Sequence, residues 1–427
     1  MSTSRSKIRV GTLGLRRGEV IARSADAVGM KLVAVCDTRE DRLRAVGEQY
    51  GVATYTDYDR FLEHDMDAVI VANYFHQHAP FAIRALEAGK HVLSETSACK
   101  TLGEGVALAR AVEASGRIYM FAENQTYSAT IQELKRLCHA GEIGPVRYAE
   151  AEYNHPMSWE EQLWRRPGLD HWRQSLPPTY YCSHTMGPLM TITDTMPISV
   201  NALAISDPEQ QTKTVAVGDP AAVTLCRMSD GSVVRLFGLR LPVHHYYWRL
   251  VGTRGMIDTV RGRGLVRIAR DEWDCEEGQT TELMYRATYE KQSLEARLAG
   301  HGGADYWTLL DFAEAIRSGR QPYLDVYRGL AMCVVGILAW KSAHEDGKPY
   351  EVPDYRDEAS RRQYENDDWS PWPEDRRPGQ PWPSIRGEIR PDPDVVAAAE
   401  AYWARTAEVR GSAANDIAGW LRYPDRK

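Results

Sequence analysis

Residues 7–37 read KIRVGTLGLRRGEVIARSADAVGMKLVAVCD, and this stretch decides the fold of the N-terminal part. Residues 8–13 form a short, mostly apolar run that is typical of a buried strand, and residues 32–36 form a second one. Between them lie a turn bounded by Gly14 and Gly18 and a segment with helical spacing, residues 19–28. Asp37 follows the second run. Strand, glycine turn, helix, strand and acid predict a βαβ unit that binds a dinucleotide.

The residue types in this unit favour one dinucleotide. Glycines let the backbone approach a pyrophosphate, which then lies at the helix N-terminus. Asp37 is placed to accept hydrogen bonds from the adenosine ribose, and its charge would repel a 2′-phosphate, so NAD is favoured over NADP. The turn reads G-x-x-x-G instead of G-x-G-x-x-G. A glycine turn without a nucleotide is the alternative, which the surrounding βαβ pattern and the acid disfavour.

Composition excludes several classes of protein. The chain has 427 residues, 43% of them hydrophobic and 26% charged, as expected of a globular protein with two domains and a tail. A net charge of −7 without a long basic run argues against a nucleic-acid partner. No apolar run approaches the ~20 residues of a membrane span, and no hydrophobic signal region precedes the first strand, so we expect a cytoplasmic protein. The seven scattered cysteines form no C-x-x-C pair, and no metal site is predicted.

Strands and helices continue to alternate up to residue 122. Apolar runs at residues 68–72, 91–94 and 118–122 are separated by helical patterns, which predicts a parallel sheet. Ligands bind beyond the carboxyl ends of such strands, so the loops after them should share one cleft. We therefore expect the cofactor to contact Gly14, Leu15, Arg16, Arg17, Gly18, Asp37, Thr38, Arg39, Asn73, His78, Glu95, Thr96, Glu123 and Asn124.

The pattern changes after residue 145. Two-residue periodicity between residues 199 and 268, with a hairpin turn at residues 229–231, predicts a mainly antiparallel sheet. Residues 304–317 and 326–344 are predicted helices. From residue 354 the chain is polar but holds five tryptophans, which predicts a tail lying on its own surface or on a partner subunit. We thus expect an α/β chain with a Rossmann domain (residues 1–125), an α+β substrate and oligomerisation domain with an open sheet (126–353) and a tail (354–427).

Short motifs resemble the Gfo/Idh/MocA family of sugar oxidoreductases. They are HAP at residues 78–80, AGKHVL at 88–93, HGG at 301–303, DVY at 325–327 and VPD at 352–354, and the resemblance covers roughly residues 8–353. It implies an open sheet that serves as an oligomer interface, so a homo-oligomer is expected. The lysine that usually assists alcohol oxidation in this family is replaced here by Thr96, and Lys100 lies four residues further on. Threonine is no base near neutral pH, which disfavours an ordinary sugar dehydrogenase.

Two further segments, ENQTY at residues 123–127 and YCSHTMGP at 181–188, resemble NAD-dependent α-N-acetylgalactosaminidases and related NAD-dependent glycosidases. The resemblance implies hydrolysis through transient oxidation of the sugar at C3, loss of the C2 proton, departure of the C1 oxygen, addition of water and reduction of the ketone. Such a path needs acids and bases, and the resemblance makes Tyr127 and His184 the catalytic pair, with Tyr181 third. The alternatives are that His184 caps its helix and that Tyr127 and Tyr181 are core tyrosines.

An aromatic and basic insert precedes the His184 segment. Trp164, Trp172 and Arg173 are predicted to bind substrate, because aromatic faces stack on sugars and arginine binds anions. Plain packing is the alternative. Inward-pointing arginines would suit a sulfonated or uronic glycoside. Tyr246 or Tyr247 could supply another phenol, and we assign Tyr247 to the substrate.

The leading hypothesis is therefore an NAD-dependent glycoside hydrolase acting on a small glycoside by transient C3 oxidation and elimination. The first alternative is an NAD-dependent sugar dehydrogenase that uses Tyr127 or His184 in place of the lysine. The second is a non-catalytic NAD-binding protein. Thr96 disfavours the dehydrogenase, and the Tyr127 and His184 segments disfavour the non-catalytic protein.

Overall fold

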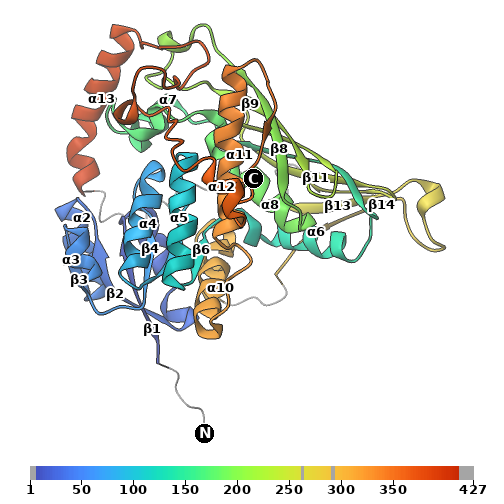
Figure 1. Cartoon of the computed structure of the whole chain (residues 1–427), viewed down its shortest axis with the longest axis horizontal. Helices are drawn as coiled ribbons and strands as arrows, with labels where there is room; N and C mark the ends of the chain where they lie inside the picture. Colours follow the sequence, from blue (N-terminus) through green and yellow to red (C-terminus); the bar gives the residue numbers. More distant parts are fainter. Residues whose placement is uncertain (1–5, 261–263, 290–293, 413–427) are drawn as a thin grey trace.

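The N-terminal domain is built on a six-stranded parallel sheet with the order β3-β2-β1-β4-β5-β6 (Figure 1). The computed structural model describes residues 6–260, 264–289 and 294–412. The strands are β1 (Ile8–Leu13), β2 (Met30–Cys36), β3 (Ala53–Tyr55), β4 (Ala68–Val71), β5 (His91–Ser94) and β6 (Tyr119–Phe121). The helices are α1 (Arg17–Ala22), α2 (Glu40–Tyr50), α3 (Tyr58–Leu62), α4 (His78–Glu87) and α5 (Leu102–Ser115). This confirms the predicted Rossmann architecture.

Two details of this domain differ from the prediction. The first helix was predicted over residues 19–28, but α1 ends at Ala22 and the chain turns through a short 3-10 helix, Asp26–Val28. The turn closes at Gly29 (φ +74°), and the Met30 N–H bonds back to the carbonyl of Ala25. β3 was not predicted, since it has three residues, none of them fully buried, and so shows no apolar run.

The second domain holds a nine-stranded sheet with the order β14-β13-β12-β11-β7-β10-β9-β8-β15. Among the described strands of this nine-stranded sheet, only β7 and β10 pair in parallel. This confirms a mainly antiparallel sheet. The strands are β7 (Val146–Asn154), β8 (Pro197–Ile205), β9 (Ala221–Met228), β10 (Val233–Leu239), β11 (His245–Gly252), β12 (Met256–Val260), β13 (Leu265–Ala269), β14 (Glu282–Arg286) and β15 (Tyr350–Glu351). β9 and β10 form the predicted hairpin, with Gly231 at φ +85°.

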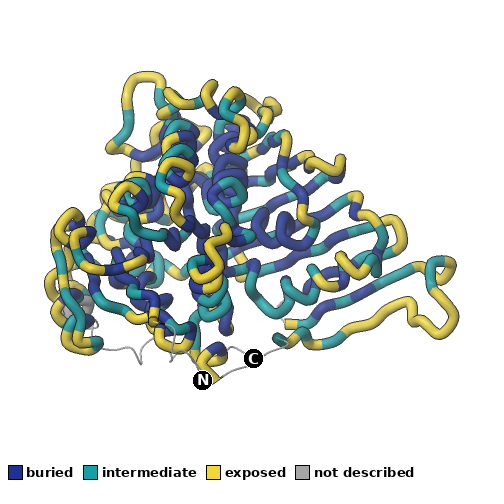
Figure 2. Tube along the Cα trace, turned by 60° about the horizontal axis from the view of Figure 1, so that its bottom comes forward, coloured by how far each residue is buried: buried dark blue, intermediate teal, exposed yellow. Residues whose placement is uncertain are grey.

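Helices cover one face of this sheet, between it and the Rossmann domain (Figure 1). They include α6 (Ala129–His139), α8 (Ser183–Thr193) and α11 (Val326–His344), whereas α10 (Ala304–Ser318) packs against α1 of the Rossmann domain. The buried chain concentrates where these helices meet the strands, whereas β14 and the loop before it are largely exposed (Figure 2). On the face away from the helices, Leu203 is 60% exposed and Leu225 is 41% exposed. The open sheet face thus carries apolar side chains.

One helix, α11, is long and apolar enough to span a membrane by length and composition alone. In the most apolar 18-residue stretch of this helix, 83% of the residues are buried inside the protein. The buried core helix of a globular protein can have the same length and composition. Trp340 in its C-terminal half is fully buried. α11 is therefore the central core helix of the described structure.

The C-terminal segment packs on its own chain, which is the first of the two predicted alternatives. Hydrogen bonds between tryptophan indoles and backbone carbonyls join it to the rest of the protein. Trp372 is fully buried and donates from Nε1 to the carbonyl of Trp172 at 3.1 Å. The carbonyl of Trp382 accepts from Trp340 Nε1 at 3.1 Å, within the core helix. The segment includes α12 (Glu358–Arg362) and α13 (Pro393–Ser412), which lies beside α7 (Trp159–Arg165). Trp420 lies outside the described residues.

Candidate active site

The turn after β1 brings the backbone close to its neighbours. A Cβ atom at Gly14 (φ +88°) would lie 2.3 Å from the carbonyl oxygen of Ala72, and one at Gly18 would lie 2.3 Å from Thr12 Oγ1. Asp37 at the end of β2 accepts hydrogen bonds from the N–H groups of Leu15 (2.7 Å) and Arg39 (3.0 Å). Glycine is therefore required at both turn positions, and the turn and the acid are held in one geometry.

Polar atoms without partners surround this turn. Both amide atoms of Asn73, Oδ1 of Asn124 and Oγ1 of Thr12 are buried and make no hydrogen bond within the described chain. They belong to β1 or to the loops after β4 and β6, at the carboxyl edge of the sheet. Buried polar groups are normally hydrogen-bonded, so these atoms fit a polar ligand laid along this edge. The residues present fit a dinucleotide.

Arg17 is engaged inside the protein. Its guanidinium makes two hydrogen bonds of 2.6 Å to Asp305 on α10 and one of 2.7 Å to Glu95 after β5. Burial alone would lower the Arg17 pKa, but the charges and hydrogen bonds of these two carboxylates raise it overall. Arg17 and Glu95, both predicted to contact the cofactor, thus join the nucleotide turn to the second domain.

His78 and Thr96 lie in the neighbouring loops. His78 is buried, with Nδ1 2.9 Å from the carbonyl oxygen of Ser97 and Nε2 3.3 Å from that of Asn73. Burial lowers its pKa, which keeps the ring neutral. Thr96 is buried beside Glu95, which accepts a hydrogen bond from its N–H at 3.0 Å. Lys100 is paired with Asp375 at 2.8 Å and does not return to the position of Thr96.

A close contact joins the predicted catalytic residue His184 to Glu123. His184 is in the first turn of α8, and its Nδ1 lies 2.7 and 2.9 Å from the carboxylate oxygens of Glu123, which follows β6. Glu123 is fully buried and also accepts from the N–H of Gln125. With a carboxylate at Nδ1, that nitrogen carries the proton, and Nε2 is left to take or give one. The pair is a base held in one tautomer by a buried acid.

Two tyrosines flank this imidazole, and a third stacks on one of them. Ring centres lie 4.6 Å from His184 for Tyr153 on β7 and 4.9 Å for Tyr181, which meets it edge-on. Tyr246 on β11 is the cross-strand partner of Tyr153 and stacks on it at 4.5 Å. Burial raises the pKa of Tyr246 to about 12 and that of Tyr153 well above the usual value. The phenols of Tyr153 and Tyr246 therefore stay protonated at neutral pH and can donate.

Tyr127 points elsewhere. Its hydroxyl donates to Asp311 on α10 at 2.5 Å. Burial, followed by the charge of Asp311, raises the Tyr127 pKa well above that of a free tyrosine. The structure brings His184 and Tyr181 together but places Tyr127 on a different partner.

The predicted role of Tyr247 needs a correction. Its hydroxyl donates to Asp258 at 3.2 Å, and Asp258 is in turn bound by Arg267. Successive side chains of a strand point to opposite faces, so only one of two adjacent tyrosines on β11 can face His184. That residue is Tyr246, and Tyr247 is on the far face.

An aromatic wall, formed by Phe75, Trp172 and Tyr181, flanks the tyrosine group. Phe75, from the loop after β4, stacks on Trp172 at 5.0 Å and on Tyr181 at 5.6 Å. The Arg173 guanidinium lies 4.5 Å from the Trp172 ring centre and 5.8 Å from that of Tyr181. Trp164 is half-buried on α7. The wall therefore joins the nucleotide-binding domain to the predicted substrate insert.

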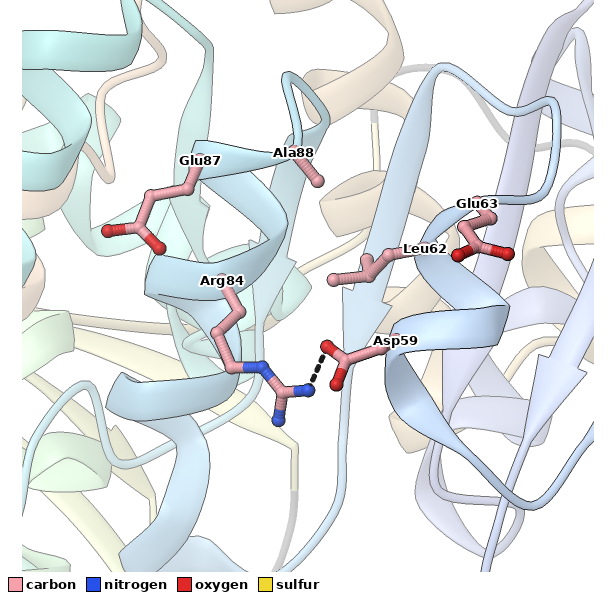
Figure 3. A pocket seen from close by; sticks show the side chains of 6 residues that line it. All are labelled: Asp59, Leu62, Glu63, Arg84, Glu87 and Ala88. Carbon is pink, nitrogen blue, oxygen red and sulfur yellow. Dashed lines mark hydrogen bonds and ion pairs between the residues drawn. The ribbon is translucent and has the colours of Figure 1, made fainter.

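A separate groove lies on the outside of the Rossmann domain, between α3 and α4 (Figure 3). Asp59 and Arg84 form an ion pair across it, and Leu62, Glu63, Glu87 and Ala88 complete its lining. It contains none of the residues predicted for the site. The described part of the chain also holds no group of three or more His, Cys, Asp or Glu side chains arranged for a metal ion.

Two family profiles match the chain. One, described as the Gfo/Idh/MocA oxidoreductase family with an NAD-binding Rossmann fold, matches residues 8–123, and the other, described as the glycosyl hydrolase 109 C-terminal domain, matches residues 200–361. The chain joins a Gfo/Idh/MocA NAD-binding domain to a glycosyl hydrolase 109 C-terminal domain. This confirms the resemblance inferred from the short motifs.

Relatives and solved structures agree with these two domains. Proteins named glycosyl hydrolase family 109 protein from Solibacter usitatus (strain Ellin6076) and Streptomyces niveus are 26% and 27% identical over 82% of this chain, and the matches span 88% and 78% of those proteins. A levoglucosan dehydrogenase in complex with NADH and L-sorbose is similar in structure, with a TM-score of 0.68 and 18% identity over 82% of this chain and 100% of that one. At this identity the structural likeness shows the fold alone.

Sequence reasoning missed three features of the site. Glu123 was predicted only to line the cofactor, and its pairing with His184 was not foreseen. Tyr153 was seen only as part of a strand, although the tyrosines at 153 and 246 belong to runs of alternating side chains. Phe75 carried a signal, since it is an apolar residue in a polar loop of a predicted cleft.

Proposed function

We propose that this protein is an NAD-dependent glycoside hydrolase that works by transient oxidation of the sugar at C3. The observation that carries the proposal is the Glu123–His184 pair, set among neutral tyrosines beside an NAD-binding sheet edge. The names of the glycosyl hydrolase family 109 relatives support a glycosidase, and Thr96 at the family's lysine position argues against a simple dehydrogenase.

Gly14, Asp37, Asn73 and Asn124 would hold the cofactor. NAD is favoured over NADP because the Asp37 carboxylate would repel a 2′-phosphate. When bound, NAD would supply the hydride acceptor for the C3–H bond and, once reduced, the hydride donor for the C3 ketone. The tight Gly14–Gly18 turn and the loop joined through Arg17 suit a cofactor that stays bound from one turnover to the next.

His184 is the proposed base. Nε2 takes a proton from the C3 hydroxyl as that carbon is oxidised, or from C2 once the ketone has made the C2–H bond acidic. Glu123 stabilises the imidazolium that forms and keeps the proton of Nδ1 in place. Because Glu123 reaches the reaction only through His184, it is a positioning residue.

The tyrosines are the proposed proton donors. When the C2 proton is lost, the C1–O bond breaks, and the departing oxygen receives a proton from Tyr181. Water then adds across the C1–C2 double bond, with the hydroxyl at C1 and the proton at C2, and reduction of the ketone restores the C3 hydroxyl. Tyr153 and Tyr246, which stay protonated, donate hydrogen bonds to sugar oxygens. The sum is hydrolysis without net redox change.

Anionic glycosides, sulfonated or uronic, are the proposed substrates. Arg173 beside Trp172 and Tyr181 supports this choice, because the guanidinium lies next to rings on which a sugar can stack. The exposed Leu203 and Leu225 on the open sheet face support a homo-oligomer.

The proposal is tested with aryl glycosides in deuterated water and no added cofactor. We expect phenol release, deuterium at C2 of the sugar product and no accumulation of NADH. NADH that accumulates in step with a keto sugar would instead identify a dehydrogenase. Silence with every neutral and anionic glycoside would favour a non-catalytic NAD-binding protein.

The roles of the pair are tested by substitution. His184→Gln should lower kcat by about 100- to 10,000-fold, the usual contribution of a general base. Glu123→Gln should lower kcat less and change its pH profile, because it alters the proton affinity of His184 without removing the base. An unchanged pH profile in Glu123→Gln would reduce Glu123 to a structural residue.

A further inference from the structure

Three arginines, Arg166, Arg173 and Arg240, are gathered around Gln174. Arg173 precedes Gln174, and the Arg166 carbonyl accepts a hydrogen bond from Gln174 Nε2. Arg240 donates to the carbonyl of Gly218, whose N–H donates to the Gln174 carbonyl. Arg166 is 3% exposed, and its Nε and Nη1 atoms make no hydrogen bond. Arg240 donates from Nη2 to the carbonyls of Gly218 (2.9 Å) and Asp219 (2.6 Å), while its Nη1 has no partner. Within the described residues none of the three arginines forms an ion pair.

The surrounding acids are already engaged. Glu161 pairs with Arg165 at 2.9 Å. The Asp219 carboxylate accepts from Ser384 Oγ at 2.7 Å and from the N–H of Ile385 at 2.8 Å, and it meets Arg240 only through its backbone carbonyl. The group therefore holds more positive charge than its surroundings neutralise.

The protonation behaviour of the group agrees with this geometry. Burial lowers the pKa of Arg166, and the neighbouring cations Arg240, Arg173 and Arg165 lower it further. Burial lowers the pKa of Arg240 to about 10, with Asp219 opposing and Arg173 adding to the shift. His171 lies against the same group, and burial, then Arg173 and Arg166, lowers its pKa to about 3. The ring is thus neutral and offers no negative charge.

Arg173 connects this group to the proposed reaction site. Arg173 is 5.8 Å from the ring centre of Tyr181, which is 4.9 Å from that of His184. A sugar ring beside His184 thus has the Arg173 guanidinium one side chain away. Desolvating a cation without a partner is costly, so the buried Arg166 beside the half-buried Arg173 and Arg240 is best explained by an anion that enters from outside.

We propose that Arg166, Arg173 and Arg240 form a subsite for an anionic substituent, a carboxylate or a sulfonate, on the glycoside that occupies the His184 site. This inference rests on the proposed function and narrows its substrate. The reaction uses C1, C2 and C3, so an anion on the exocyclic C6 leaves the reacting carbons free. A planar carboxylate offers two oxygens to the guanidinium groups and a tetrahedral sulfonate offers three, so the test includes both.

The test compares three aryl glycosides with the full-length protein: an unmodified glucoside, the glucuronide and the 6-deoxy-6-sulfo glucoside. We expect a higher kcat/KM for at least one anionic glycoside than for the neutral one. Arg173→Gln and Arg240→Gln should each reduce the ratio of anionic to neutral kcat/KM by about 10- to 100-fold, the effect of losing a charge-assisted hydrogen bond. The exposed Arg320 provides a matched Arg→Gln control that should keep the wild-type ratio.

Several outcomes would overturn the subsite. Hydrolysis of the neutral glucoside with C2 deuteration, but with no preference for either anion, would leave the hydrolase standing and remove the anionic subsite. An equal loss on all three glycosides, together with release of NAD from Arg173→Gln on dialysis, would assign the arginines to the cofactor pyrophosphate.

A binding measurement tests the subsite apart from turnover. Titration of the folded protein with methanesulfonate and with D-glucuronate should show saturable binding of at least one of them that Arg173→Gln weakens by about 10-fold or more. Arg240→Gln serves as the second variant if Arg173→Gln does not fold. Absence of binding of both probes, or binding unchanged in the variants, would contradict the subsite even if every glycoside proves inert.

Discussion

Arg17 and Arg166 are two inward-facing arginines with opposite electrostatic surroundings. Arg17 contacts two carboxylates, Glu95 and Asp305, and its pKa is raised despite burial. Arg166 has other arginines as its neighbours, and its pKa is lowered. The comparison separates two uses of a buried cation. A charge that is matched within the chain fixes the structure, whereas an unmatched charge is available to a ligand.

The matched pair is part of the architecture. Arg17 is in the nucleotide turn and Asp305 is on α10, 288 residues further along the chain, with its side chain 1% exposed. The unmatched Arg166 lies just after α7, whose Leu163 packs in a small cluster with Ala399 of α13. Its burial follows from the packing around it and not from a charge partner.

The largest effect is expected from breaking the matched pair. Arg17→Met leaves Asp305 buried with only His301 beside it and should lower the free energy of unfolding by about 3–5 kcal/mol. Urea unfolding followed by tryptophan fluorescence measures this change. The control is Arg60→Met, which removes an exposed pair with Glu63 and should leave the urea midpoint unchanged. A loss no greater than in the control would show that the Arg17 contacts add nothing to stability.

The unmatched arginine should respond with the opposite sign. Arg166→Met removes a buried cation that has no partner, so the free energy of unfolding of the ligand-free protein should rise by about 1–3 kcal/mol. Methanesulfonate should stabilise the wild type against urea but have a smaller effect on this variant. A destabilisation as large as that of Arg17→Met would mean that Arg166 is matched inside the protein after all.

A smaller effect is expected from pH, and it separates the two regions. His171 has a folded pKa of about 3, below the unfolded value near 6.5, so the native state excludes a proton that the unfolded chain binds. Its contribution is complete above pH 6.5 and is lost as the pH falls toward 3. When the pH falls from 7 to 5, the free energy of unfolding of His171→Phe should therefore decrease by about 1–2 kcal/mol less than that of the wild type.

Asp305 acts in a different pH range. Its pKa is lowered: burial opposes the shift, but the hydrogen bonds from Arg17 and His301 outweigh it. Its contribution is therefore present above the unfolded value near 4 and is lost only at lower pH.

The His171 prediction is tested by the urea midpoints of wild type and His171→Phe, measured at pH 7, 6 and 5. Parallel pH profiles for the two proteins would contradict the assigned protonation of His171.

The sequence predicts well those features that follow from local pattern. The glycine turn and Asp37 predict the βαβ unit, and the alternation of strands and helices predicts a parallel sheet. Tyr181 and His184 are three residues apart across the start of a helix, so their proximity follows from chain geometry. The hairpin at Gly231 is local in the same way.

Long-range contacts could not be predicted from one sequence. Glu123 and His184 are 61 residues apart in different domains, and no sequence pattern near either residue indicates the other as its partner. Tyr246 and Tyr247 are adjacent, so the choice between them depends on which face of β11 is turned inward. The sequence around Arg17 and Arg166 does not indicate that their electrostatic surroundings are opposite, because both the burial and the partners arise from tertiary packing.

The contact between Trp372 and Trp172 has a consequence for synthesis. The two residues are 200 positions apart, and the indole of Trp372 closes the aromatic wall by its bond to the Trp172 carbonyl. At about 5–20 residues per second, a ribosome needs roughly 10–40 s to pass from one to the other. During that interval Trp372 cannot cover Phe75 and Trp172, and the nascent chain exposes an incomplete aromatic wall. A chaperone that meets this chain therefore meets the aromatic wall before the tail that closes it.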